Sequence, residues 1–363
     1  MRAKISRMQY FFTIPNLMYG KAIGITSGII ARRVGGDTWI ADSFAFAVGI
    51  VLMIIMTYLN SRFPEKTIIQ YATELVGKWP GRLLALILTL FFTVAFATSA
   101  NVMVIHLKEY FLIQTPLLVV CLAYVLLCMY GAYLGIEVAV RFSLLGFFMT
   151  LAINVTMLLG TMRDFRLINL LPLMDKGIVA DVSNSIYLYS DMAMAILAVG
   201  ILYPMLNSKH KSLSLSFWAW VVGAINILLW PVAETAVLGP DLMQKYIVVC
   251  MTQVRAAQFT KYLPRYELLM VSFFAFAVYV QSVTMFHCAK HSIKQLTGIK
   301  KDWHIIIPLG IVSLGITYVM IYDRMIFVDF LTYPWPQVCA ALSSGLPLLL
   351  LLTALIRGKL KQS

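Results

Sequence analysis

Two ionisable side chains stand inside long apolar stretches of this sequence, each beside residues that break helices. Lys21 is flanked by Gly20 and Gly24 in the first such stretch. Asp191 follows Ser190 in the sixth. A lone charge in hydrocarbon is costly, whereas a charge that is paired or lines a cavity is tolerated. Broken helices also free backbone N–H and C=O groups for a ligand, so we expect the two breaks to meet at mid-membrane and form a small-molecule site.

Two uses of these charges remain open. Lys21 and Asp191 could pair across the cavity, in which case Lys21 would take the place of a coupling cation and remove any need for sodium. Alternatively, Lys21 could extend to the aqueous boundary and Asp191 could cap the end of a helix. Lys21 lies deep in its apolar stretch, so the pairing role is favoured for Lys21 and the capping role for Asp191.

Two other apolar stretches each present a stripe of residues at helical spacing, one in the third stretch and one in the eighth. A zwitterionic amino acid needs donors for its carboxylate and acceptors for its ammonium group, which free backbone at the breaks, including Ser190 to Met194, would supply. The same spacing also suits plain packing between membrane helices. The candidate ligand contacts are Gly20, Lys21, Phe91, Ala95, Ser99, Ser190, Asp191, Met194, Ala277, Gln281 and Thr284.

The composition places these residues in a membrane protein. Of the 363 residues, 61% are hydrophobic and 12% are charged, and the mean hydropathy is +0.84, which leaves too little polar surface to cover a soluble globule. The amino terminus carries basic residues but no cleavage motif, so we expect the first stretch to be retained. Ten stretches have the roughly 20 residues that a helix needs to cross a bilayer, at about 10–30, 40–60, 83–105, 116–135, 142–162, 184–206, 214–238, 267–288, 304–322 and 336–356.

Lysine and arginine are distributed unevenly among the predicted loops. The loops on one side of the membrane, with both chain ends, hold 17 of the 29, and the opposite loops hold 11, with Lys21 inside the first stretch. Positively charged loops favour the cytoplasm, so both termini are expected to be cytoplasmic. The net charge of +13 then reflects topology and lipid headgroups. No nucleic-acid partner is expected, because no basic cluster with interleaved surface aromatic residues occurs.

The chain, a single transmembrane domain over 1–363, divides into halves of similar organisation, 1–162 and 180–357. In each half, two apolar stretches precede a long polar connection and three follow it. The connections, Asn60–Arg82 and Gly239–Arg265, both end in a lysine and an aromatic residue shortly before a proline, and both could lie along the membrane interface. Five is an odd number, so the second repeat would be inverted, as in many secondary transporters.

Other polar residues carry weaker signals. Glu234, near the end of the seventh stretch, is interpreted as marking the outer end of that helix, and a place on the path by which a ligand enters is the alternative. Glu137 and Arg141 have the i,i+4 spacing of a structural ion pair.

Metal, cofactor and catalytic chemistry have little support. His287 and His291 have a spacing that could hold a metal, but no acidic residue lies between them and both fall near a helix end where basic side chains favour the helix dipole. The five cysteines show no paired metal or redox spacing. No phosphate-binding loop and no nucleophile with a base is found. We therefore expect no enzyme activity, no cofactor and no metal.

Several short motifs occur in an order and spacing that resemble one family. They are Asn16-Leu17-Met18-Tyr19-Gly20, Trp39 after a Gly-Gly-Asp loop, Gly77-Lys78-Trp79, Thr115-Pro116, Gly135-Ile136-Glu137 with Arg141, and Arg265-Tyr266-Glu267. Together they resemble the B subunit of GerA-type nutrient germinant receptors, which are spore germination proteins of the amino acid-polyamine-organocation transporter superfamily. The resemblance implies an all-α membrane protein of ten transmembrane helices, a LeuT-like 5+5 inverted repeat in which helices 1 and 6 are broken.

The resemblance also implies a function. It points to the inner membrane of a bacterial spore, to recognition of an amino acid or similar nutrient, and to assembly with A and C subunits, and it makes Gly20, Phe91 and Gln281 pocket residues. The sequence departs from the family in two places, at Lys21, where a small residue is usual, and at Ala195–Val199, which lacks the usual small-residue-plus-glutamate pair, so a different ligand is possible. An amino acid or polyamine permease working by alternating access and a scaffold without a ligand remain the alternatives.

Overall fold

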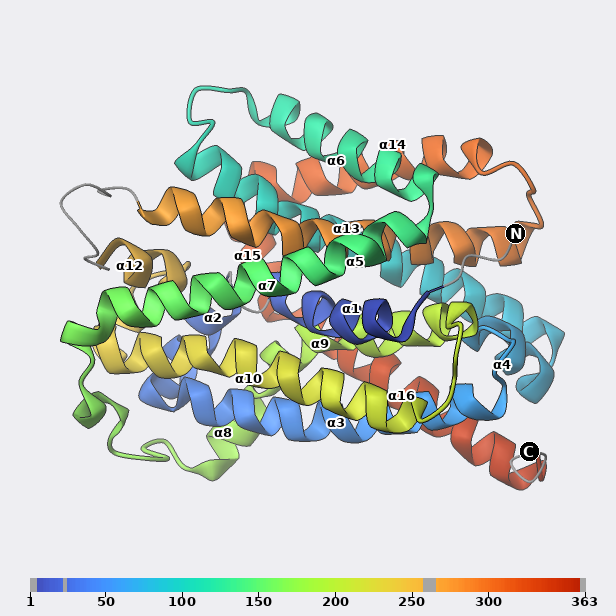
Figure 1. Ribbon diagram of the computed structural model, residues 1–363, viewed down its shortest axis with the longest axis horizontal. Coiled ribbons are helices and arrows are strands. Elements are labelled where there is room, and N and C mark those ends of the chain that lie inside the picture. Colours follow the sequence, from blue (N-terminus) through green and yellow to red (C-terminus); the bar gives the residue numbers. More distant parts are fainter. Residues whose placement is uncertain (1–4, 22–24, 257–265, 360–363) are drawn as a thin grey trace.

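The computed structural model describes residues 5–21, 25–256 and 266–359, and only the backbone of Lys21. Most of its helices run along the long axis of an elongated bundle (Figure 1). The α-helices are α1 (Arg7–Lys21), α2 (Ser27–Val34), α3 (Thr38–Arg62), α4 (Ile68–Val76), α5 (Lys78–Tyr110), α6 (Leu117–Leu134), α7 (Ile136–Thr161), α8 (Ile178–Asn184), α9 (Ile186–Leu202), α10 (Ser212–Leu238), α11 (Pro240–Met243), α12 (Val249–Ala256), α13 (Tyr266–Thr297), α14 (Trp303–Tyr322), α15 (Arg324–Thr332) and α16 (Pro334–Ile356). Short 3-10 helices are η2 (Gly35–Asp37), η3 (Met162–Asp164), η4 (Leu167–Leu170) and η5 (Tyr203–Met205).

Nine stretches within the described residues are long and apolar enough to cross a membrane. The first of them, Ser27–Arg62, includes α2, η2 and α3. Helix α1 has 15 residues and supplies most of the first predicted segment, 10–30. The structure thus agrees with the ten predicted segments. The limits of the two repeats, 1–162 and 180–357, stay a prediction.

The helices differ in how much of their surface faces the inside of the bundle. In α9 every residue after Ile186 is buried, and this helix packs against α16, α3 and α1. In contrast, α16 exposes apolar side chains such as Leu349, which suits contact with lipid. Figure 1 likewise shows α1 and α9 within the bundle. These two helices are therefore the central elements on which an internal site can be built.

The first and the sixth segments are both interrupted, as predicted. Helix α1 ends at Lys21, and α2 begins at Ser27. The sixth segment is interrupted at Ser185, between α8 and α9. The sequence placed this interruption too late, because Ser190 to Met194 lie within the continuous helix α9.

The helix-breaking residues of the sixth segment have other uses. The Ser190 hydroxyl donates to Tyr187 O at 2.7 Å, so it is satisfied inside the helix. A Cβ on Gly200 would lie 3.0 Å from Ile68 Cβ, so this glycine permits α4 to pack closely. Pro204 lies in η5, where the helix ends. The predicted free backbone in this stretch is therefore wrong, and α9 can offer a ligand side chains but not backbone groups.

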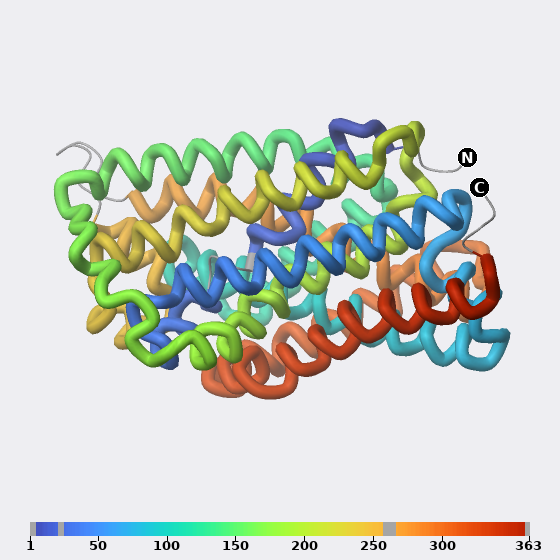
Figure 2. Tube along the Cα trace, turned by 90° about the horizontal axis from the view of Figure 1, so that it is seen from below, coloured from blue at the N-terminus to red at the C-terminus, as the bar shows by residue number. Residues whose placement is uncertain are grey.

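The first long connection contains the predicted amphipathic helix, α4. Its first turn is closed by a capping box in which the Thr67 hydroxyl accepts from the Gln70 backbone N–H and the Gln70 side chain accepts from Thr67 N–H. Its apolar face is buried against the bundle. The start of α1 and the end of α16 lie at the same end of the bundle as α4 (Figure 2). In the second connection α11 and α12 are helical, and the Lys261–Pro264 sequence lies outside the described residues.

Candidate functional site

The two interrupted segments meet at Asp191. Thr26, immediately before α2, donates its hydroxyl to Asp191 Oδ2 at 2.5 Å. Asp191 is fully buried in α9, and Ser190 Oγ lies 3.5 Å from its Oδ1. The side chain of Lys21 lies outside the described residues, as do residues 22–24, so the pairing of Lys21 with Asp191 stays a prediction. Asp191 therefore links the sixth segment to the far side of the first break, the interruption between α1 and α2.

The near side of the first break is in contact with Gln281 of α13. Gln281 Nε2 donates to Leu17 O, one turn before the end of α1, at 2.6 Å. A Cβ built on Gly20 would lie 2.3 Å from Gln281 Oε1, so only glycine leaves room for this amide. Gln281 is fully buried. The structure thus brings together two of the predicted contacts, Gly20 and Gln281, from segments far apart in the sequence.

A second pair of predicted contacts joins α5 to α9. Ser99 donates to Ala95 O at 2.9 Å, and its hydroxyl lies 3.9 Å from Met194 Sδ. All three residues are fully buried. Their side chains are small, apolar or satisfied within the helix, and their contact with a ligand stays a prediction.

The remaining predicted contacts are explained by packing. Phe91 stacks on Trp335 of α16, with ring centroids 5.4 Å apart and an interplanar angle of 9°. Thr284 donates to Val280 O at 2.7 Å inside α13. Ala277 is buried against α7, where its backbone nitrogen would lie 3.4 Å from a Cβ on Gly146. Contact of Phe91, Ala277 and Thr284 with a ligand stays a prediction.

A buried polar network beside α1 was missed by the sequence analysis. Tyr19 donates its hydroxyl to Asn154 Oδ1 at 2.9 Å, and Trp230 Nε1 donates to the same oxygen at 2.7 Å. Asn154 Nδ2 in turn donates to the backbone and side-chain oxygens of Asn226 at 2.7 and 2.6 Å. The network ties α1 to α7 and α10. Asparagine inside an apolar helix was the available signal, since such residues join membrane helices by hydrogen bonds.

Two further acids lie near Asp191. Asp42 of α3 and Glu234 of α10 are almost fully buried, and Asp42 is close enough to Glu234 and Asp191 for the three carboxyl groups to interact electrostatically. From its position in the sequence, Glu234 was interpreted as marking the outer end of a helix. Glu234 does lie in the last turns of α10, but its side chain is enclosed by the bundle. The region around the first break is therefore more acidic than Asp191 alone indicates.

The weaker sequence predictions can be placed as well. Arg141 Nη2 lies 3.7 Å from Glu137 Oε2, so the predicted i,i+4 ion pair is present on the surface. His287 and His291 stack with ring centroids 6.3 Å apart. In the described ranges no group of three or more histidine, cysteine, aspartate or glutamate side chains could hold a metal ion. All five cysteines are buried.

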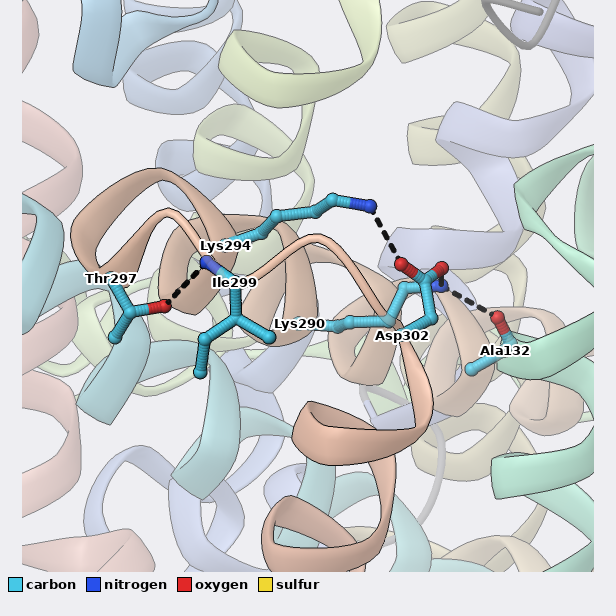
Figure 3. A network of polar contacts seen from close by, with 6 residues as sticks. All are labelled: Ala132, Lys290, Lys294, Thr297, Ile299 and Asp302. Carbon is cyan, nitrogen blue, oxygen red and sulfur yellow. Dashed lines mark hydrogen bonds and ion pairs between the residues drawn. The ribbon is translucent and has the colours of Figure 1, made fainter.

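A separate polar network holds the other end of α13 (Figure 3). Lys290 Nζ donates to Ala132 O in the last turn of α6 at 2.8 Å and lies 3.1 Å from Asp302 Oδ2. Lys294 Nζ lies 2.6 Å from Asp302 Oδ1. Asp302 lies between α13 and α14, outside the spanning helices. Burial raises the pKa of its carboxyl group, but the ammonium groups of Lys294 and Lys290 lower that pKa more, so the pKa lies below the usual value for aspartate.

Solved structures define the class of protein to which this geometry belongs. The fold is similar to that of MhsT, solved in complex with L-phenylalanine, with a TM-score of 0.61 and 12% identity over 98% of this chain and 99% of MhsT. It is also similar to Mhp1, a nucleobase-cation-symport-1 family transporter, with a TM-score of 0.61 and 12% identity over 95% of this chain and 78% of Mhp1. A Na+-coupled sialic acid symporter has a TM-score of 0.57 and 13% identity over 96% of this chain and 85% of the symporter. The protein is therefore a multi-pass membrane protein with the predicted LeuT-like fold.

Within that class, the chain belongs to the spore germination protein family, whose model matches residues 4–325. It is 24% identical to spore germination protein YndE of Bacillus subtilis (strain 168) over 179 residues, which is 49% of each chain. It is 23% identical to spore germination protein KB of the same organism over 78% of each chain, and 22% identical to spore germination protein GerQB of Bacillus cereus over 88% of each. Family and fold are those of permease-like membrane proteins and not of enzymes.

Proposed function

We propose that this protein is the nutrient-sensing membrane subunit of a spore germinant receptor. It binds an amino acid or a similar small nutrient at the first break and signals to A and C subunits, in the inner membrane of the spore with both termini in the cytoplasm. The observation that carries the proposal is the meeting of both interrupted segments at buried polar groups, with Thr26 on Asp191 and Gln281 on Leu17. Membership of the spore germination protein family supports the biological setting.

The groups around the first break suit the ammonium end of an amino acid. The last carbonyl groups of α1 and the Asp191 carboxyl group attract an ammonium group. Ser99 and Met194 form an apolar wall for the side chain. The recognition is therefore polar at the first break and apolar between α5 and α9.

Binding at this place can be converted into a signal. The ligand would contact α1, α9 and α13 at once, so it would favour one relative arrangement of these helices over another. A ligand shifts such an equilibrium only by its difference in affinity for the two arrangements. The partner subunits would then respond to the favoured arrangement of the bundle.

The alternative is a permease that moves an amino acid or polyamine by alternating access. It has specific support, because the solved structures of similar fold are transporters and broken helices at mid-membrane are part of that mechanism. Fold similarity alone does not separate sensing from transport.

Binding and uptake by the full chain in liposomes, with labelled amino acids offered singly, test the proposal. Saturable binding without uptake supports the receptor, and concentrative uptake supports the permease instead. Absence of both would contradict a ligand site and leave a scaffold. A matched pair of variants locates the site: Gly20→Ala should abolish or weaken binding, because its Cβ would lie 2.3 Å from Gln281 Oε1, whereas Gly315→Ala in α14, with open space around it, should not.

A further inference from the structure

We propose that the Gln281 side chain is a built-in competitor of the ligand, which it resembles in hydrogen-bonding groups and which must displace it from the first break. The inference rests on the proposed function, and it assigns Gln281 a role opposite to that of a simple contact residue. A contact residue strengthens binding, whereas a competitor weakens it and sets the nutrient concentration at which the protein responds.

The donor of the Gln281 amide is already used. Nε2 donates to Leu17 O at 2.6 Å, four residues before the end of α1. A backbone carbonyl oxygen has two lone pairs, so it can accept this bond in addition to one within the helix. This carbonyl is one of the acceptors that the ammonium group of an amino acid would seek. The amide therefore holds an acceptor that belongs to the ligand site.

The acceptor of the same amide is not used. Gln281 Oε1 is buried and has no hydrogen-bond partner among the described residues, and the side chain as a whole is fully buried. A buried polar atom without a partner is destabilising. The present position of the amide is thus satisfied at one end only, which makes it easier to displace than a fully bonded side chain.

The amide also fills the space beside Gly20. A Cβ at this glycine would lie 2.3 Å from Gln281 Oε1, 3.1 Å from its Cδ and 3.4 Å from Val278 Cα. A ligand that binds the free backbone of α1 at this point needs the same space. The amide and the ligand therefore exclude each other, and the departure of the amide from Leu17 changes the contact between α1 and α13.

The decisive measurement is the affinity of the purified full chain in liposomes for labelled amino acids, each offered singly. Gln281→Ala removes both the bulk and the donor, and we expect it to bind more tightly, by roughly tenfold if one hydrogen bond no longer competes. Weaker or unchanged binding in a folded variant would overturn the proposal, and weaker binding would make Gln281 a contact residue. If wild type and variant both bind none of the amino acids, the proposed function fails as well.

Two controls make the sign interpretable. Gln253→Ala in α12 removes another fully buried glutamine whose Oε1 has no partner among the described residues. It should leave affinity unchanged, because Gln253 Nε2 bonds Met157 Sδ of α7 and not a carbonyl group of α1. Gln281→Ser also removes most of the bulk and the donor to Leu17, and serves if the alanine variant does not fold; tighter binding supports the proposal and weaker or equal binding overturns it.

Discussion

Helix α13 carries polar side chains at two levels, and they differ in how fully they are bonded. Near its carboxyl end, Lys290 Nζ contacts both Ala132 O and Asp302, and Lys294 Nζ contacts the other carboxylate oxygen of Asp302 (Figure 3). Near the middle of α13, Gln281 uses its donor on Leu17 and leaves its acceptor unpaired among the described residues. The difference indicates that one end of α13 is held to α6 and α14 by more polar contacts than hold its middle to α1.

The carboxyl end of α13 is reinforced by neighbouring contacts. Tyr133, in the last turn of α6, stacks on Trp303 at the start of α14 with ring centroids 4.4 Å apart. Ala132, next to Tyr133, is the residue that accepts from Lys290. Movement in response to a ligand is therefore expected between α1 and α13, and not between α13, α6 and α14.

The largest effect on stability should come from removing the contacts that Lys290 makes with Ala132 and Asp302. Lys290→Met leaves the buried Ala132 O without its donor and Asp302 with Lys294 alone, and we expect a loss of about 2 kcal/mol in unfolding free energy. Lys294→Met, whose side chain is 40% exposed, should lose only about 0.5 kcal/mol. Thermal unfolding of the full chain in detergent measures both. Equal losses, or a change in ligand affinity without a change in stability, would contradict the assignment of Lys290 to a structural role.

The next effect concerns Asp191 at the first break, and it should appear in ligand affinity and not in stability. Asp191→Asn keeps an oxygen that can accept from Thr26 but removes the negative charge that attracts an ammonium group. We expect affinity for labelled amino acids to fall roughly tenfold. Ser190→Ala is the matched control, since its hydroxyl bonds Tyr187 O and its loss leaves the charge in place. If Asp191→Asn lost stability but kept normal affinity, Asp191 would have a structural role and not a role in ligand binding.

Much of the fold was predictable from sequence because it depends on local composition. Apolar length located the ten segments, and the positions of glycine and lysine located the end of α1. The interruption of the sixth segment was placed too late because Ser190 is a weak helix breaker whose hydroxyl can bond back to the helix. Helical spacing put Gln281 on one face of the eighth segment, and in the structure this side chain contacts α1 at Leu17 O; its contact with a ligand stays a prediction.

The rest of the site depends on which faces of distant helices meet, and a single sequence does not show that. Tyr19 and Asn154 form a hydrogen bond although 135 residues separate them in sequence, and no pattern in either segment indicates that they meet. Asp42 lies in a different helix from Asp191, so its electrostatic contact with Asp191 was also hidden. Phe91 belongs to an apolar stripe on α5. The spacing of that stripe does not show whether Phe91 contacts a ligand or, as in the structure, packs against the Trp335 ring.

A smaller effect on stability is expected when the Asp302 carboxyl group is titrated with acid. The pKa of Asp302 is lowered in the folded protein, so the ionised carboxylate contributes stability above the unfolded pKa of about 3.9, and this contribution is lost as the pH falls through the lower, folded value. The stability difference between wild type and Asp302→Asn should therefore be constant from about pH 7 to pH 5 and should shrink only below about pH 4. A difference that already shrinks near pH 6 would mean that Lys294 and Lys290 do not hold the carboxylate ionised.

The smallest effect should come from the ion pair between Glu137 and Arg141 at the amino end of α7, which tests whether pairing or burial decides how much an ion pair stabilises the protein. This pair has opposite charges like Lys290 and Asp302, but its atoms lie 3.7 Å apart and its side chains are 41% and 70% exposed. Water screens such a pair, so Glu137→Gln should change the unfolding free energy by less than about 0.5 kcal/mol. Thermal unfolding beside Lys290→Met gives the comparison directly. A loss of unfolding free energy as large as that of Lys290→Met would show that opposite charges alone stabilise the amino end of α7. Burial would then not explain why the two ion pairs differ.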